Sequence, residues 1–150
     1  MDRFELFASS ILELNRYLQK IKDMEMRSFG LKGNHVMSLY YLSRNPQGLT
    51  ATELTEACKE DKAAISRTIT QLVEKGYVCR ESDENKRAYR TKLFLTDQGK
   101  ELVQLVDRRI DFALTRGGNG LTDEQRRIFY STMDMILDNL SHYNPNELNP

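Results

Sequence analysis

Cysteine and histidine are both scarce in this chain, and their scarcity argues against two kinds of site. Among its 150 residues there are two cysteines and two histidines. Cys58 and Cys79 form no CxxC pair, and neither has a histidine nearby in the sequence, which makes a disulfide or a zinc site improbable. We expect two partly buried thiols in a reducing compartment, with a redox switch as the less favoured alternative. We expect no metal or other cofactor, and we expect His35 to cap a helix or to lie on the surface.

Long apolar runs are also missing. The longest are far too short to cross a bilayer, and the first five residues lack the basic-then-apolar order of a signal peptide. Hydrophobic residues make up 39% of the chain and charged residues 29%, which suits a globular protein with one core. We therefore expect a cytoplasmic protein with no membrane partner.

A net charge is absent as well, because 22 basic side chains balance 22 acidic ones. The distribution is nevertheless uneven. Between Lys62 and Lys92 there are eight lysines and arginines but only four acidic residues, so this segment carries +4 and the remainder −4. A local basic surface on a neutral chain is typical of a DNA-contacting segment attached to another part.

Apolar residues recur at helical spacing at both ends of the chain. The first stripe consists of Phe4, Phe7, Ile11, Leu14, Leu18 and Ile21. The last consists of Phe129, Met133, Ile136, Leu140 and Tyr143. This spacing predicts a helix in each place. Neither helix can cover its own stripe, so each must pack on other helices of this chain or of a second copy.

Capping signals predict a pair of helices in the middle of the chain, after a short helix around residues 35–43. Thr50 and Glu53 form a capping box that begins one helix. Asp61 caps the next helix, and Gly76 ends it in the left-handed conformation that glycine favours. Two helices joined by so tight a break indicate a helix-turn-helix.

Beyond Gly76 the apolar period changes from helical to alternating. Residues 77–81 and 89–95 are predicted to be two strands joined by a polar, basic turn, and a further helix is expected from Thr96. The order is thus a long helix, three short helices, a hairpin and two helices. We expect a mainly α fold with a small β-hairpin wing, that is, a winged helix-turn-helix with flanking dimerisation helices.

The second helix of a helix-turn-helix enters the major groove, where its exposed face meets the bases. Here Ile65, Ile69 and Leu72 are expected to face the core. Arg67 is the strongest single candidate for base contact, because a guanidinium can bond guanine edges or a phosphate. The candidates on this helix are Lys62, Ala63, Ser66, Arg67 and Thr70.

The hairpin supplies the other candidates. A basic wing can lay an arginine into the minor groove. The residues are Lys86, Arg87, Arg90 and Lys92, of which Arg90 and Lys92 are expected on one strand face beside the phosphates. The alternative is a solvated hairpin whose lysines protect an edge strand from aggregation.

These segments together resemble the MarR family of transcriptional regulators. The run from Ala63 to Val78 resembles that family's recognition helix and its exit into the wing. The wing from Asp83 to Arg90, followed by Leu93 to Gly99, resembles the family's wing and its terminal L-T-x-x-G. The resemblance covers nearly the whole chain, with residues 31–96 as the DNA-binding lobe and residues 1–29 and 97–143 as a helical dimerisation lobe.

The wing departs from the family pattern at one point. The family often has D-x-R-D-R there, whereas this chain has Lys86 between Asp83 and Arg87 and no second aspartate. Arg90 therefore competes with Arg87 as the minor-groove residue. Asp83 resembles the family's acidic residue that braces the wing arginine.

The resemblance implies a homodimer that binds a pseudo-palindromic site in double-stranded DNA, usually as a repressor. Its interface would be built by Phe4, Phe7, Ile11, Leu14, Phe129, Met133, Ile136 and Leu140. Many members release DNA when a small, often aromatic, anion binds. Residues that could line such an inducer cleft, although a core or dimer role is favoured for most, are Tyr17, Phe29, His35, Tyr40 and Tyr41.

Two other classes of protein are alternatives to a DNA-binding regulator. The chain has no phosphate loop, no nucleophile elbow and no paired-carboxylate motif, so we expect no enzyme and no catalytic residue. A winged-helix module for protein–protein contact, with its basic wing facing an acidic partner, stays open as the alternative function.

Overall fold

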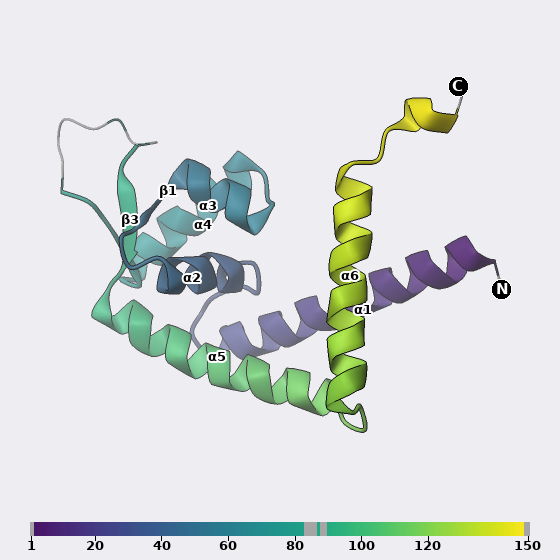
Figure 1. Ribbon diagram of the computed structural model, residues 1–150. Coiled ribbons are helices and arrows are strands. Elements are labelled where there is room, and N and C mark those ends of the chain that lie inside the picture. Colours follow the sequence, from purple (N-terminus) through teal and green to yellow (C-terminus); the bar gives the residue numbers. More distant parts are fainter. Residues whose placement is uncertain (1, 83–86, 88–89, 149–150) are drawn as a thin grey trace. The chain divides into compact units, whose positions relative to one another are not determined.

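The computed structural model describes residues 2–82, 87 and 90–148. The chain divides into two units, Met1–Ala113 and Leu114–Pro150. The helices are α1 (Arg3–Arg27), α2 (His35–Arg44), α3 (Ala51–Cys58), α4 (Lys62–Glu74), α5 (Asp97–Gly117) and α6 (Asp123–Ser141), followed by a short 3₁₀ helix (Pro145–Leu148). The predicted helices are thus confirmed, and their order is drawn in Figure 1.

The helix ends form where the capping signals predict them. The amide of Glu53 donates to Thr50 Oγ1 at 3.2 Å, and Glu53 Oε2 accepts from the amide of Thr50 at 2.7 Å. At the start of α4, Asp61 Oδ1 accepts from the amide of Ala64 at 2.8 Å. The chain leaves α4 through Gly76, whose φ of 78° belongs to the left-handed region.

The strands form a three-stranded antiparallel sheet with the order β1-β3-β2. They are β1 (Leu49–Thr50), β2 (Val78–Arg80) and β3 (Lys92–Leu95). The hairpin is confirmed, but its strands are shorter than predicted, and the prediction missed β1, which pairs Leu49 with Leu93. The amide of Arg90 donates to the carbonyl of Arg87 at 2.8 Å. Arg90 therefore lies in a turn, and the prediction that it shares a strand face with Lys92 is wrong.

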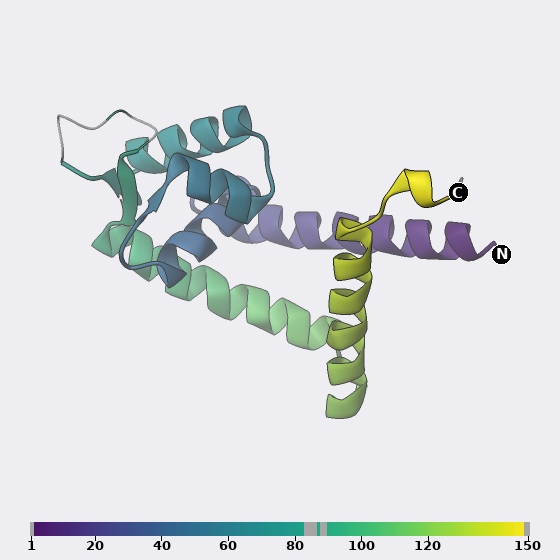
Figure 2. The ribbon, with the colours of Figure 1, turned by 45° about the horizontal axis from the view of Figure 1, so that its top comes forward.

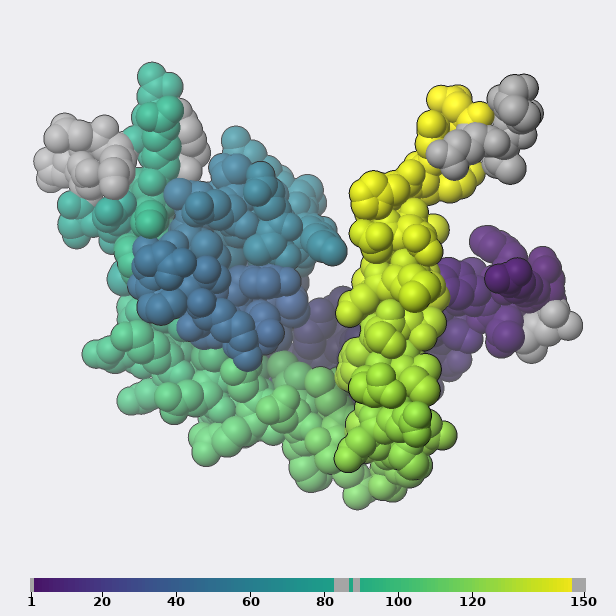
Figure 3. Space-filling view, viewed as in Figure 1, coloured from purple at the N-terminus to yellow at the C-terminus, as the bar shows by residue number. Residues whose placement is uncertain are grey.

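The core of the first unit lies where α2, α3 and α4 meet the sheet and α5. Its most deeply buried large apolar side chains are Met26, Leu39, Leu54, Ile65, Leu72 and Leu93. Figure 3 shows α2, α3 and α4 as one packed mass beside the strands. This packing holds α4 with one face against the core and the other in solvent.

His35 is the clearest correction to the sequence-based expectations. Its side chain is 1% exposed, so the prediction of a surface position is wrong. Nδ1 accepts from the amide of Lys32 at 2.8 Å, which closes the turn before α2, and Nε2 lies 2.7 Å from Oε1 of Gln71 on α4. Gln71 is distant in the sequence, so local patterns could not identify it as a partner.

The apolar stripes at the chain ends remain largely uncovered. On α1, Phe4 is 76% exposed and Phe7 and Ile11 are each 46% exposed. On α6, Phe129 and Leu140 are exposed, whereas Met133 and Ile136 are half-buried. Among the described residues, none of the helices combines the length and apolar character that a membrane-spanning helix needs.

Candidate nucleic-acid interface

Helix α4 separates its residues into the two faces that the sequence predicts. Ile65, Ile69 and Leu72 are buried. Thr68, which the prediction did not place in the core, is buried with them. The predicted contact residues are all exposed on the opposite side: Lys62, Ala63, Ser66, Arg67 and Thr70. In both ribbon views the strands lie beside α3 and α4, so this face adjoins the start of the wing (Figures 1 and 2).

Arg67 is an exposed cation on this face. Within the described part of the chain its guanidinium makes no hydrogen bond, ion pair or ring contact. The hydroxyl of Thr70 donates to the carbonyl of Ser66 at 3.0 Å, so Thr70 Oγ1 retains its capacity to accept. The face therefore offers a free planar donor group and small polar side chains that permit a close approach.

A hollow of about 630 Å³ lies between α3, α4 and β2. Its lining residues are Ala51, Thr52, Thr55, Glu56, Lys62, Ser66, Ile69 and Arg80. It brings the predicted Lys62 and Ser66 together with Arg80, which was counted in the basic segment but not proposed as a contact. Arg80 could have been found from the sequence by its position in β2, the strand that directly follows the recognition helix. It stands two positions after the buried Val78.

The wing candidates divide into three groups. Arg87 and Arg90 are described and exposed. Lys86 and Asp83 lie outside the described residues, so the predicted bracing contact is not placed. Lys92 is half-buried in β3, and its Nζ donates to the carbonyl of Gln47 at 3.2 Å, which directs this side chain toward the loop before β1.

Two ionisable groups around α3 have shifted pKa values. The pKa of Glu53 is lowered, first because its carboxylate accepts from the amide and hydroxyl of Thr50, and to a smaller degree by Lys92. The pKa of Cys58 is raised, mainly by burial, which outweighs the opposing hydrogen bond from Ser38. Burial therefore keeps Cys58 in the less reactive thiol form. No cluster of three or more metal-ligating side chains occurs among the described residues.

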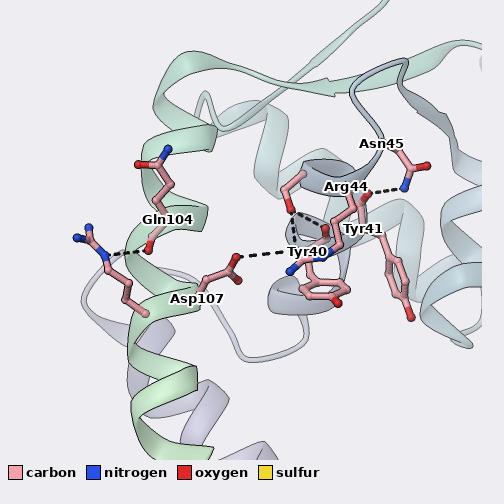
Figure 4. A network of polar contacts seen from close by, with 8 residues as sticks. Tyr40, Tyr41, Arg44, Asn45, Gln104 and Asp107 are labelled. Atoms are coloured by element: carbon pink, nitrogen blue, oxygen red, sulfur yellow. Dashed lines mark hydrogen bonds and ion pairs between the residues drawn. The ribbon is translucent and has the colours of Figure 1, made fainter.

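Helix α2 is joined to α5 by a polar network on the outer side of the unit (Figure 4). The Arg44 guanidinium lies 3.7 Å from the ring centroid of Tyr40, and its Nη1 is 3.8 Å from Asp107 Oδ2. Beside this network is a hollow of about 390 Å³. It is lined by Leu42, Ser43, Pro46, Phe94, Leu95, Lys100, Val103, Gln104 and Asp107.

The aromatic residues proposed for an inducer cleft do not line either of these hollows. Phe29 and Tyr41 pack against the core, whereas Tyr17 is exposed on α1. The ring of Tyr40 lies under Arg44, and His35 is buried next to α4. Phe29 and Tyr41 thus agree with the favoured core role.

Comparison with known proteins identifies the same family. A model of the MarR family matches residues 29–88. YybA of Bacillus subtilis (strain 168), an uncharacterized HTH-type transcriptional regulator, is 25% identical over 125 residues, which are 83% of this chain and 82% of that protein. A MarR transcriptional regulator from Methanosarcina mazei Go1 superimposes with a TM-score of 0.80 at 27% identity, over 90% of this chain and 96% of the other.

A third relative was solved on DNA. The Staphylococcus aureus MepR–DNA complex superimposes with a TM-score of 0.79 at 18% identity, over 93% of this chain and 99% of that protein. At this identity the match supports the fold alone. Together with the family model and the Methanosarcina mazei structure, it confirms the resemblance drawn from the sequence. Residues 29–88 thus match the MarR family of transcriptional regulators, and the fold of the chain is that of MarR winged-helix regulators.

Proposed function

We propose that this protein is a sequence-specific DNA-binding repressor that acts in the cytoplasm as a homodimer on a pseudo-palindromic operator. The observation that carries this proposal is the exposed face of α4, where Lys62, Ser66 and Arg67 stand clear of the core. Arg80 lies at the same hollow, and Arg87 is exposed in the wing. Cationic side chains on a groove-sized helix and an adjoining hairpin match the phosphates and base edges of duplex DNA.

Homodimer formation is supported by the uncovered apolar side chains of α1 and α6. A second copy would bury the stripe that includes Phe4, Phe7, Ile11 and Leu14, together with Phe129 and Leu140, which would otherwise face water. In such an arrangement residues 31–96 form the DNA-binding lobe and residues 1–29 and 97–143 the dimerisation lobe. Two copies of α4 would then meet half-sites about 34 Å apart, one turn of the DNA helix.

Relief of DNA binding by a small ligand is part of the proposal. Its support is the hollow between α2, β3 and α5, whose lining combines apolar side chains, Leu42 and Val103 among them, with a cation, Lys100, and a carboxylate, Asp107. Lys100 Nζ also lies 3.5 Å from Asp97 Oδ1. An apolar pocket with a few polar groups suits a small aromatic ligand, whose carboxylate would bind to Lys100. Addition of sodium benzoate or salicylate should weaken operator binding, and Lys100→Met should blunt that response without changing affinity in the absence of the ligand.

The primary experiment is the selection of bound sites from random duplexes by the purified full chain. We expect an enriched inverted repeat, and a binding constant that falls steeply with salt because phosphate contacts release counterions. The alternative function, a protein–protein contact module, predicts no enriched sequence. A reporter gene behind the selected site should be expressed less when the protein is present, and higher expression would mean an activator.

A further inference from the structure

Helix α4 has one polar side-chain contact with another helix in the part of the chain that the structure describes. Among the described residues, the bond between His35 and Gln71 is the single side-chain hydrogen bond that joins α4 to a different helix. Thr68, a polar side chain that α4 turns into the core, is 1% exposed, and its Oγ1 has no partner among the described residues, whereas Gln71 is itself exposed. Apolar packing of Ile65, Ile69 and Leu72 holds α4 against the core, and the His35–Gln71 bond adds a directional contact to it.

The contacts around His35 favour one tautomer of its ring. Nδ1 accepts from the amide of Lys32 at 2.8 Å, which favours the tautomer with its proton on Nε2. The carbonyl of Lys32 is 3.0 Å from the same nitrogen, but a proton on Nδ1 would face the amide hydrogen. Nε2 then donates to Oε1 of Gln71 at 2.7 Å. Because the ring is 1% exposed, loss of this bond leaves a buried polar group unsatisfied, which is costly.

The segment that holds His35 is fixed to α1. The amide of Gly33 donates to Asp23 Oδ1 at 2.7 Å. A Cβ at Gly33 would lie 2.5 Å from that oxygen and 2.9 Å from the backbone nitrogen of Asp23, so only glycine permits this approach. The contacts form a continuous path from Asp23 on α1 through residues 32–35 to Gln71 on α4.

Gln71 lies on α4 close to Arg67, the residue that we expect to read the bases. It stands four positions after Arg67, and residues at that spacing lie above one another on one side of a helix. The bond from His35 therefore acts on the same side of α4 as Arg67, one helical turn away. It limits rotation of α4 about its own axis, and that rotation sets where the guanidinium points.

We propose that His35 is a positioning residue, which through Gln71 holds α4 in the rotation that sequence-specific recognition requires and links that rotation to α1. This inference rests on the proposed DNA-binding function. The proposal predicts that two properties of the protein can be changed independently. Sequence discrimination depends on the His35–Gln71 bond, whereas general attraction to phosphates does not.

The test uses two substitutions at position 71 in the full chain. Gln71→Met keeps the length of the side chain but removes the acceptor, and Gln71→Glu keeps an acceptor oxygen. The readout is the ratio of the affinities for the selected operator and for a scrambled duplex. The negative charge that glutamate adds weakens both affinities alike, so its effect cancels in the ratio. Gln71→Met should lower this ratio by about tenfold, as expected for a loss of about 1.4 kcal/mol, with scrambled-duplex affinity unchanged. Gln71→Glu should restore it, and Gln98→Met, at an exposed position of α5 outside both hollows, is the matched control.

Two measurements without DNA keep this inference separate from the proposed function. In a ¹⁵N spectrum of the imidazole, His35 should carry its proton on Nε2 in the wild type. Amide exchange in the second half of α4 should be faster in Gln71→Met than in Gln71→Glu or the wild type. A proton on Nδ1, equal exchange in all variants, or equal discrimination by Gln71→Met and the wild type would each overturn the assignment. A wild-type protein that discriminates no sequence would refute the proposed function instead.

Discussion

Arg67 combines the properties that distinguish a base-reading side chain from a generally basic one. It stands on the exposed face of α4, away from the buried Ile65 and Ile69, and has no partner among the described residues. Its five donors can form two parallel bonds to a guanine edge without first breaking an ion pair of the protein. Recognition by Arg67 therefore carries no cost for releasing another contact.

We predict that Arg67→Ala weakens binding to the selected operator by about 1–3 kcal/mol and relaxes the base preference at one position of each half-site. Titration of labelled operator and of its single-base variants measures both effects. Arg108→Ala on α5 removes the same charge from an exposed position far along the chain and should leave binding unchanged. An unaltered footprint for Arg67→Ala would show that another residue reads the bases.

The wing arginine calls for a different experiment, because a hairpin side chain can contact phosphates without reading sequence. We predict that the double substitution Lys86→Ala and Arg87→Ala weakens binding to all duplexes alike. It should also reduce the slope of log affinity against log salt by about two, one for each phosphate that the wing no longer neutralises. Measurements on operator and scrambled duplex from low to moderate salt give the slope, and equal affinity at low salt would place the wing away from DNA.

Individual residues differ in how far the sequence determines their place. The helical period placed Lys62, Ser66 and Arg67 on the exposed face of α4 because the neighbours that decide this lie within two turns. It could not place His35, whose burial depends on Gln71, 36 positions away. Arg80 was missed for a related reason, since its site is formed jointly with α3 and α4.

At the scale of the elements, the first helix of the helix-turn-helix, α3, begins at a capping box whose hydrogen bonds lie at the surface. Glu53 Oε2 accepts from both the amide of Thr50 and its hydroxyl, at 2.7 and 3.0 Å. These bonds lower the pKa of Glu53. A carboxylate with a lowered folded-state pKa stabilises the fold above its unfolded pKa. That contribution is lost as the pH falls through the folded value.

We predict that Thr50→Ala lowers the free energy of unfolding by about 1 kcal/mol near neutral pH. The difference from the wild type should shrink as the pH is lowered below the ordinary pKa of a glutamate, about 4.3. Urea unfolding followed by circular dichroism at a series of pH values measures both. Thr52→Ala, in the same turn but outside the capping box, is the matched control. A difference that stays constant down to acid pH would mean that Glu53 contributes nothing.

Strand β1 illustrates what local patterns cannot predict in an element. Leu49 and Thr50 are too few to display alternation, and Thr50 also serves as the cap of α3. Their strand exists because the loop after α2 returns alongside β3, where Leu49 pairs with Leu93. The hairpin strands, in contrast, are evident from their alternating residues. Their ends were overestimated because the amide of Arg90 and the hydroxyl of Thr91 both donate to the carbonyl of Arg87, in place of bonds to a neighbouring strand.

At the scale of the whole molecule, the exposed apolar stripe on α1 bears on the oligomeric state. Phe4, Phe7 and Ile11 follow the helical period that normally marks a buried face, yet all three are exposed in the single chain. In the proposed homodimer, the partner of this stripe is the second copy. The sequence predicts the stripe itself, but a local pattern does not identify what covers it.

We predict that Ile11→Asp converts a dimer into a monomer, because a carboxylate buried among Phe7 and Leu14 of two chains would lose its hydration without gaining a partner. Light scattering after size exclusion should show a mass near 17.5 kDa, the mass of one chain. Operator affinity should fall by about 10²-fold or more, since two half-sites held by one dimer profit from a high effective concentration that separate monomers lack. Ser9→Asp adds the same charge on another side of α1 and should leave both mass and affinity unchanged. If Ile11→Asp remains dimeric, the interface does not include the α1 stripe. If it becomes monomeric and keeps full affinity, pairing does not contribute to DNA recognition.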